Sequence, residues 1–303
     1  MSRIVRFATF LWILSAASVS RAEAPPDPVA HARDVLAAAR QALGGAEALD
    51  GVHAITLEGE LRRQLPADDG GADPGEMAGS VRVDALVPDR YLRVDTLSPL
   101  PGMPGIPLAT GLDGDEAWAG PLPVAASSHM VIRTAPPADA DARGRMKERV
   151  QREAALFLVA LLAGGGEVSY SWVGEAEAPE GRADVLAVSG HGNLEARLFV
   201  DQKTRRPLLL TFADAPPRMM VRRMAPGAER PRAQAADAPE AMPTPPPLAE
   251  ATLFLSDWKR VGGVLLPHTL RKTLDGKPYE EIVVTRYLLN DPKLTADKFR
   301  KKV

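Results

Sequence analysis

The stretch SDWKRVGGVLLPHTLRKTLDGKPYEEIVV, residues 256–284, contains three strand-like runs separated by two glycine turns. Gly262-Gly263 and Asp275-Gly276 are dipeptides that readily adopt the left-handed backbone of tight hairpin turns. The runs between them are rich in valine, leucine and threonine, which favour strands. Because strands joined by such short turns pair with their sequence neighbours, the stretch predicts an antiparallel meander and not a parallel α/β fold.

The same pattern continues toward the N-terminus. Residues 54–63, AITLEGELRR, alternate apolar and polar side chains, which is typical of a strand with one buried face. GLDGDEAWAG predicts a hairpin that turns at Asp113-Gly114 and returns through Trp118. Further strand-like runs are GSVRVDAL, RYLRVDTL, VSYSWVGEAE, ADVLAVSG, LEARLFVDQKT and PLLLTFAD. The sequence therefore predicts a mainly β, α+β fold with about ten to twelve antiparallel strands.

Residues 139–163 predict the one long helix in the middle of the chain. Its first half is charged, whereas its second half, AALFLVALLA, is apolar on every side. A helix that is apolar all round must be buried all round. The run is also shorter than the roughly 20 apolar residues that span a membrane. We expect this helix to dock into the concave side of a curved sheet.

Residues 1–22 have the parts of a secretory signal peptide. Arg3 and Arg6 form a basic start, an apolar run follows, and small residues precede a cleavage site expected after Ala22. The alternative is an N-terminal membrane anchor, which requires a longer apolar run. The segment thus predicts export to the periplasm. The mature chain, residues 23–303, is expected to form a single domain.

Composition narrows the class of protein further. The chain has 37 Lys+Arg against 39 Asp+Glu and no cysteine. A mildly acidic chain has no electrostatic attraction for nucleic acid, and without disulfides the fold must be stabilised by burial. Residues 216–250, rich in proline, alanine and arginine, predict a disordered insertion. Its arginines suit a solvated loop; the alternative is contact with an acidic envelope protein partner or with lipid headgroups.

Catalytic and metal-binding patterns are weak. The five histidines lie singly, and the carboxylates of LDGDE at 112–116 lack calcium-loop spacing, so we predict no metal and no cofactor. Ser256, Asp257 and His268 lie close in sequence, but neighbours on a strand point to opposite faces. Ser256 and Asp257 therefore cannot both approach the imidazole as a catalytic triad requires. A hydrolase using Ser256 or His268 is the least favoured hypothesis.

The last three strand-like runs are apolar on both faces. Leu253 and Leu255 alternate with Phe254 and Trp258, for example. A strand of this kind is buried on both faces or turns one face to a cavity. A packed core and a lipid-sized cavity have the same sequence pattern, so both remain open.

Three stretches together resemble the LolA/LolB-like superfamily, periplasmic proteins of the outer-membrane lipoprotein-sorting type. They are ARQALGGAEALDGVHAITLEGEL, GLDGDEAWAG, and LFVDQKTRRPLLLTF with the later LFLSDWKRVGGVLLPHTLRKTLDGKPYEEIVV. The resemblance implies an incomplete antiparallel β-barrel with helices on its concave side. It also implies an apolar cavity there that accepts acyl chains.

These observations predict a non-enzymatic periplasmic protein that binds a lipid, an acylated protein or another hydrophobic ligand, and that is not an integral membrane protein. The alternative is an envelope sensor or protein-interaction module of the same fold. The residues expected to line the cavity are the large apolar side chains of the long helix and the strands: Trp118, Phe157, Leu161, Trp172, Phe199, Phe212, Phe254 and Trp258.

Overall fold

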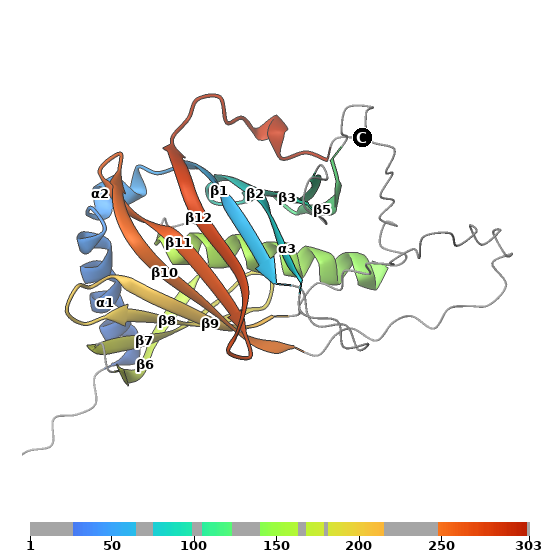
Figure 1. Cartoon of the computed structure of the whole chain (residues 1–303). Coiled ribbons are helices and arrows are strands. Elements are labelled where there is room, and N and C mark those ends of the chain that lie inside the picture. The colour runs from blue at the N-terminus through green and yellow to red at the C-terminus, as the bar shows by residue number, and fades with distance from the viewer. Residues whose placement is uncertain are drawn as a thin grey trace, which may run out of the picture.

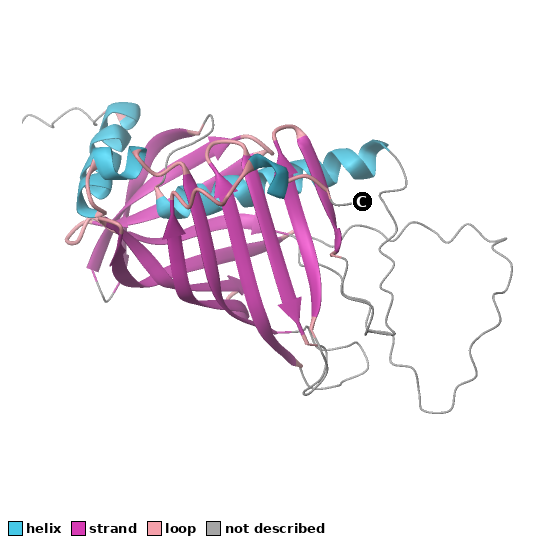
Figure 2. Ribbon diagram, turned by 90° about the horizontal axis from the view of Figure 1, so that it is seen from above, coloured by secondary structure: helices cyan, strands magenta, loops and turns pink. Residues whose placement is uncertain are grey.

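The computed structural model describes residues 27–64, 75–98, 105–122, 140–162, 168–178, 181–214 and 248–301. Twelve of their segments form one antiparallel sheet in the order β5-β4-β3-β2-β1-β12-β11-β10-β9-β8-β7-β6. All neighbours but β1 and β12 are consecutive in sequence, as expected for strands joined by short turns. The sheet curves around a long helix (Figure 2), which confirms the predicted mainly β half-barrel.

The helices and strands follow the sequence patterns closely. The strands are β1 (Ala54–Gln64), β2 (Glu76–Leu86), β3 (Arg90–Leu97), β4 (Ile106–Asp113), β5 (Glu116–Pro121), β6 (Ser169–Ala178), β7 (Gly181–Gly190), β8 (Leu194–Asp201), β9 (Pro207–Asp214), β10 (Ala249–Val261), β11 (Val264–Leu274) and β12 (Lys277–Leu289). The helices are α1 (Pro28–Ala42), α2 (Ala46–Asp50), α3 (Ala140–Leu161) and the short 3-10 helix η1 (Ala296–Lys298).

Strand alternation divides the sheet into a concave and a convex face. On β1, Ile55, Leu57 and Leu61 are buried on the concave face, and Glu58 and Glu60 point to the convex face. A register shift between β1 and β12 occurs at Glu58/Gly59. Such bulges increase the bend and twist of a strand pair, which helps this wide sheet to curl.

Helix α3 lies along the concave side, as the sequence predicts (Figure 2). All six residues from Leu156 to Leu161 are buried, whereas most of the charged first half of the helix is more exposed. The turn between β7 and β8 approaches α3 so closely that a Cβ atom at Gly192 would lie 2.5 Å from the carbonyl oxygen of Glu148. The helix is therefore packed against backbone as well as side chains.

Helix α1 packs against β6 at one edge of the sheet (Figure 1). The Asp27 carboxylate accepts a hydrogen bond from the Val29 N–H at 3.0 Å, and Pro28 occupies the first turn, as expected for a helix start. Arg40 near the end of α1 donates to the carbonyl oxygen of Leu162 at 2.6 Å. This contact joins α1 to the C-terminal end of α3.

The C-terminal segment, residues 290–301, crosses back over the convex face above β1–β3 (Figure 1). Phe299 is completely buried there, in a small second core with Ala54, Leu92, Ala109 and Leu294. The sequence of this segment is basic and does not predict that it docks onto the sheet. Its docking depends on two apolar side chains spaced too far apart to give a recognisable pattern.

The convex face of β10 to β12 differs from the expectation of burial on both faces. Phe254 is 39% exposed and Val283 is 40% exposed. The C-terminal segment lies above β1–β3 and not above β10–β12, so these side chains lack that cover. The second apolar face of these strands is therefore largely a surface.

Candidate functional site

The concave interior is filled by apolar side chains from both the sheet and α3. Leu186, Leu198 and Leu210 lie directly opposite one another on β7, β8 and β9 and are fully buried. The C-terminal half of α3 packs into the same continuous core. Of the two possibilities left open by the sequence, this structure has the packed core, with a helix occupying the middle of the half-barrel.

The residues expected to line a cavity are distributed over both faces. Phe157 and Leu161 belong to α3 itself, and Phe212 lies on the concave face of β9. Trp172 on β6 also packs against the main core. The structure thus brings these four toward one core.

Three of the other four candidates lie on the convex face, and the fourth, Trp258, packs against the main core from the edge of the sheet formed by the β10–β11 turn. Phe199 and Phe254 are both opposite Leu209 on the convex face, and Trp118 contacts the second core there. Trp258 is half-buried opposite Pro267, beside a residue with left-handed backbone at position 257. Strand parity separates Phe199, Phe254 and Trp118 from Phe157 and Leu161, although all are large and apolar.

Trp172 has an unusual surrounding under α1. Its ring makes an edge contact with His31, with the centroids 4.7 Å apart. Its indole N–H is buried and has no hydrogen-bond acceptor within the described residues. A buried donor without an acceptor costs free energy, so this N–H is available to an oxygen of a bound molecule or water.

A cluster of charges lies on the concave face between β1, β3 and β12. Arg63 donates to Asp95 at 2.6 Å and to Glu280 at 3.1 Å. Arg93 donates to the same two carboxylates, at 2.7 Å to Asp95 and 2.8 Å to Glu280. We call these four residues the inner charge cluster, a ring in which each cation contacts both anions.

Burial and pairing fix the charge states in the inner charge cluster. Burial alone would raise the pKa of Glu280, but the guanidinium groups of Arg93 and Arg63 lower that pKa to about 2. Burial opposes the charge of Arg93, yet Asp95 and Glu280 hold its pKa well above the ordinary value. Glu280 and Arg93 are therefore ionised over the physiological pH range.

Helix α3 adds one more carboxylate to this cluster. Tyr91 donates a hydrogen bond to Glu153 at 3.1 Å, and Arg93 lies 3.7 Å from the same carboxylate oxygen. Burial first, and then the Glu153 charge, raise the pKa of Tyr91 well above its usual value. The tyrosine thus stays protonated and serves as a donor.

Sequence reasoning missed the inner charge cluster, although a signal was present. In RYLRVDTL, Arg93 and Asp95 have the same parity as buried Tyr91 and Leu97. Charged residues in phase with buried ones indicate a buried polar site. Their partners on β1 and β12 are distant in sequence, so parity alone could not identify the ring.

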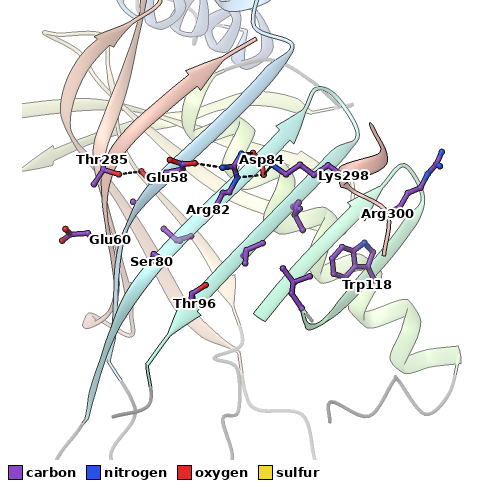
Figure 3. Close-up of a pocket in the computed structure, with 15 residues that line it drawn as sticks. Glu58, Glu60, Ser80, Arg82, Asp84, Thr96, Trp118, Thr285, Lys298 and Arg300 are labelled. Atoms are coloured by element: carbon purple, nitrogen blue, oxygen red, sulfur yellow. Dashed lines mark hydrogen bonds and ion pairs between the residues drawn. The ribbon is translucent and has the colours of Figure 1, made fainter. Parts of the chain in front are cut away.

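A groove of about 820 Å³ lies on the convex face beside the C-terminal segment. Figure 3 shows Glu58, Arg82, Asp84 and Lys298 in a row across β1, β2 and the segment. Arg82 pairs with Glu58 and with Asp84, and Lys298 lies 2.7 Å from Asp84. The apolar part of the lining includes Leu92, Val94 and Leu122.

The charges of this groove bind one another. Burial alone would raise the pKa of Asp84, but hydrogen bonds from Arg82, Lys298 and Thr56 lower it overall. Trp118 forms the far wall (Figure 3) and donates to the carbonyl oxygen of Phe299 at 2.8 Å. The groove is thus an amphipathic surface whose charged row fastens the C-terminal segment to the sheet.

The three residues considered for catalysis are not assembled into a site. Ser256 lies opposite Thr269, the neighbour of His268, so Ser256 and His268 point to opposite faces. His268 is buried and contacts the carbonyl oxygen of Leu266 at 3.1 Å. Asp257 has a left-handed backbone (φ 54°) and pairs with Lys259, so simple alternation does not apply at that residue.

The carboxylates of LDGDE take part in ion pairs. Asp113 accepts from Arg90 at 2.7 Å, and Asp115 accepts from Lys147 of α3 at 2.9 Å. Asp113 and Glu116 close the β4–β5 hairpin at Gly114, as the sequence predicts. Within the described ranges, no group of three or more metal-ligating side chains comes together.

The described residues define an open antiparallel half-barrel with a helix on its concave side. Among solved structures, the chain is similar to the LolA superfamily protein NE2245 from Nitrosomonas europaea, at 13% identity and a TM-score of 0.46, over 89% of this chain and 97% of that one. It is also similar to a DUF1329 family protein from Desulfovibrio piger, at 12% identity and a TM-score of 0.46, covering 91% and 98%.

A third similar structure is a domain of the outer membrane lipoprotein-sorting type from Vibrio parahaemolyticus, at 10% identity and a TM-score of 0.43, covering 88% of this chain and 97% of that one. No family model and no curated protein matches the chain. LolA-type proteins, which the sequence resembles, are thus among the similar structures. Similarity at this level does not extend to the ligand.

Two expectations fall on residues that the structure leaves undescribed: the signal peptide at 1–22 and nearly all of the insertion at 216–250. Among the helices that are described, none has the length and apolar character needed to cross a membrane.

Proposed function

We propose that the protein is a non-enzymatic carrier that binds an acyl chain, or another elongated apolar ligand, on the concave face of the sheet. The ligand occupies the space that the second half of α3 fills in this structure. One observation carries the proposal: the half-barrel has its interior filled by one separate helix, and six consecutive residues of that helix are buried.

Helix α3 is suited to move as a unit. Its first half carries charges toward solvent, and its second half supplies the apolar surface that fills the sheet. Displacement exposes apolar area on both partners, at a cost of about 25 cal/mol per Å². An acyl chain that enters the vacated space recovers about 0.8 kcal/mol for each buried methylene. Binding and helix displacement are thereby coupled.

The proposed compartment is the periplasm, after removal of residues 1–22. There the ligand is a lipid or the acyl chains of a lipoprotein. The predicted signal peptide supports the compartment, and the apolar interior supports the ligand class.

The test is native mass spectrometry, with lipid extraction, of the protein purified from its own envelope. It is combined with titration by N-phenyl-1-naphthylamine, a neutral probe that fluoresces in apolar sites. We expect a co-purified acyl compound and a saturable rise in fluorescence. Protein that carries no lipid and leaves the probe fluorescence unchanged would refute the proposal.

A further inference from the structure

We propose that the ligand is anionic, and that its carboxylate or phosphate binds Arg93 and Tyr91 in the place that Glu153 occupies in this structure. This inference rests on the proposed function, because it requires α3 to leave the concave face. It adds the chemical class of the headgroup and names the residues that recognise it.

Glu153 is the most loosely held member of the polar site. Its side chain is 32% exposed, against 9% for Glu280 and 17% for Arg93. Among the described residues, Glu153 accepts one hydrogen bond, from Tyr91, and it lies 3.7 Å from Arg93, beyond hydrogen-bond distance. By contrast, Asp95 and Glu280 each accept short hydrogen bonds from both arginines. Glu153 is therefore the carboxylate that can be exchanged.

Departure of α3 changes the charge of the site. With Glu153 present, the three carboxylates exceed the two arginines by one negative charge. Without it, the inner charge cluster is neutral, and Tyr91 loses its acceptor while Arg93 loses a nearby anion. A buried donor that loses its acceptor favours a replacement. An anion from the ligand restores the arrangement that Glu153 provides.

The order of residues along α3 resembles an anionic amphiphile. The Glu153 carboxylate is the head, and the apolar residues 154–161 form a tail about 12 Å long at the helical rise of 1.5 Å per residue. Phe157, one turn after Glu153, contacts the ring of Tyr91 with the centroids 5.9 Å apart. Tyr91 on β3 therefore contacts both the head position, Glu153, and the start of the tail, Phe157. A lipid with an acidic headgroup requires this adjacency.

The test compares dodecanoate, dodecyl phosphate and 1-dodecanol as competitors of N-phenyl-1-naphthylamine bound to the full-length mature protein at pH 7.5. The three share one tail, so any difference reports the headgroup. We expect one or both anionic ligands to bind about tenfold more tightly than the alcohol, the effect of one charge-assisted hydrogen bond. The better of the two anions identifies carboxylate or phosphate as the head.

The Glu153→Gln variant separates headgroup recognition from a simple latch. If Glu153 only holds α3 down, its removal strengthens binding of dodecanol and the anions by the same factor. We expect the anions to gain several-fold more than dodecanol, because a competing anion is gone. Glu148→Gln removes an exposed carboxylate of the same helix. It should leave the ratio of the anion affinity to the dodecanol affinity unchanged.

The double variant Arg93→Gln/Glu153→Gln keeps the excess of one negative charge and should abolish the preference for anions. Equal affinity of the wild-type protein for all three ligands overturns this inference but leaves the proposed function standing. An equal gain in affinity for all three ligands in the Glu153→Gln variant also overturns this inference. Failure of the neutral probe and all three ligands to bind removes the proposed function as well.

Discussion

Glu280 is a buried carboxylate on a concave face that is otherwise mainly apolar, and its contribution to stability must depend on pH. Its folded-state pKa of about 2 lies below the ordinary value of 4.5, because Arg93 and Arg63 outweigh the opposing effect of burial. The folded state therefore binds this proton more weakly than the unfolded chain. Glu280 stabilises the fold fully above its ordinary pKa, and this stabilisation is lost as the pH falls toward 2.

The predicted consequence is a pH-dependent effect of Glu280→Gln. At pH 7 the variant leaves the two arginines hydrogen-bonded to Asp95, with Glu153 3.7 Å from Arg93, and we expect about 3–5 kcal/mol lower unfolding free energy, typical of a broken buried ion pair. The difference in unfolding free energy between the wild-type protein and the variant should shrink as the pH falls from about 5 to about 2. Urea denaturation across this range measures it. Glu281→Gln, at the neighbouring and more exposed position, is the control; a constant loss at every pH would contradict the assignment.

The inner charge cluster also shows what the sequence can predict at the level of single residues. Parity places Arg93 and Asp95 on the inward face with Tyr91. It does not reveal that Arg63 and Glu280 meet them, because Arg63 is on β1, which is not adjacent to β3, and Glu280 is 187 residues from Arg93 along the chain. Large apolar residues such as Trp118 and Phe254 were expected in a cavity by size alone, and strand parity placed them on the convex face.

Among the elements, the strands and α3 were predictable, and the docking of the C-terminal segment was not. Alternation and glycine turns specify hairpins locally, and an all-apolar helical run requires burial. The C-terminal segment has only Leu294 and Phe299 as apolar anchors, and the acceptor for the Trp118 N–H is a backbone carbonyl that no sequence pattern marks. Its position follows from tertiary contacts.

The docking of this segment depends chiefly on Phe299. The side chain is fully buried, so Phe299→Ala should lower the unfolding free energy by about 3–5 kcal/mol, or release residues 294–301 if the segment detaches alone. Denaturation and hydrogen exchange at these residues distinguish the two results. Phe254→Ala is the matched control, because Phe254 is 39% exposed and should cost far less. Equal effects of both substitutions would contradict the described packing.

At the scale of the whole molecule, the sheet is open and, among the described residues, α3 fills the middle of its concave side. The order β5 to β6 leaves two edge strands unpaired with each other in the part of the chain that is described. A closed barrel has a fixed lumen, whereas the proposed function requires this open sheet to exchange α3 for an apolar ligand. The convex groove and the C-terminal segment lie on the opposite face from α3 (Figure 1), so they can remain in place during that exchange.

The central claim is that α3 must leave the concave face for an apolar ligand to enter. Gln151 on α3 and Gly192 on the β7–β8 turn allow a direct test, because a Cβ atom at Gly192 would lie 2.9 Å from that of Gln151. Cysteines at both positions need to separate by about 1 Å for a disulfide, and the turn must also shift away from the α3 backbone, because the new Cβ atom would lie 2.5 Å from the Glu148 carbonyl oxygen. Gly192→Cys alone requires the same shift. The chain has no other cysteine, so the bond is unambiguous.

The decisive measurement is the affinity of Gln151→Cys/Gly192→Cys for N-phenyl-1-naphthylamine before and after reduction by dithiothreitol. Gly192→Cys alone is the control, since it carries the backbone strain of a left-handed residue without the crosslink. We predict that the oxidised double variant binds at least about tenfold more weakly than the reduced one, which recovers the affinity of the control. Equal affinity in the oxidised and reduced states would contradict displacement of α3 as the route to the ligand site.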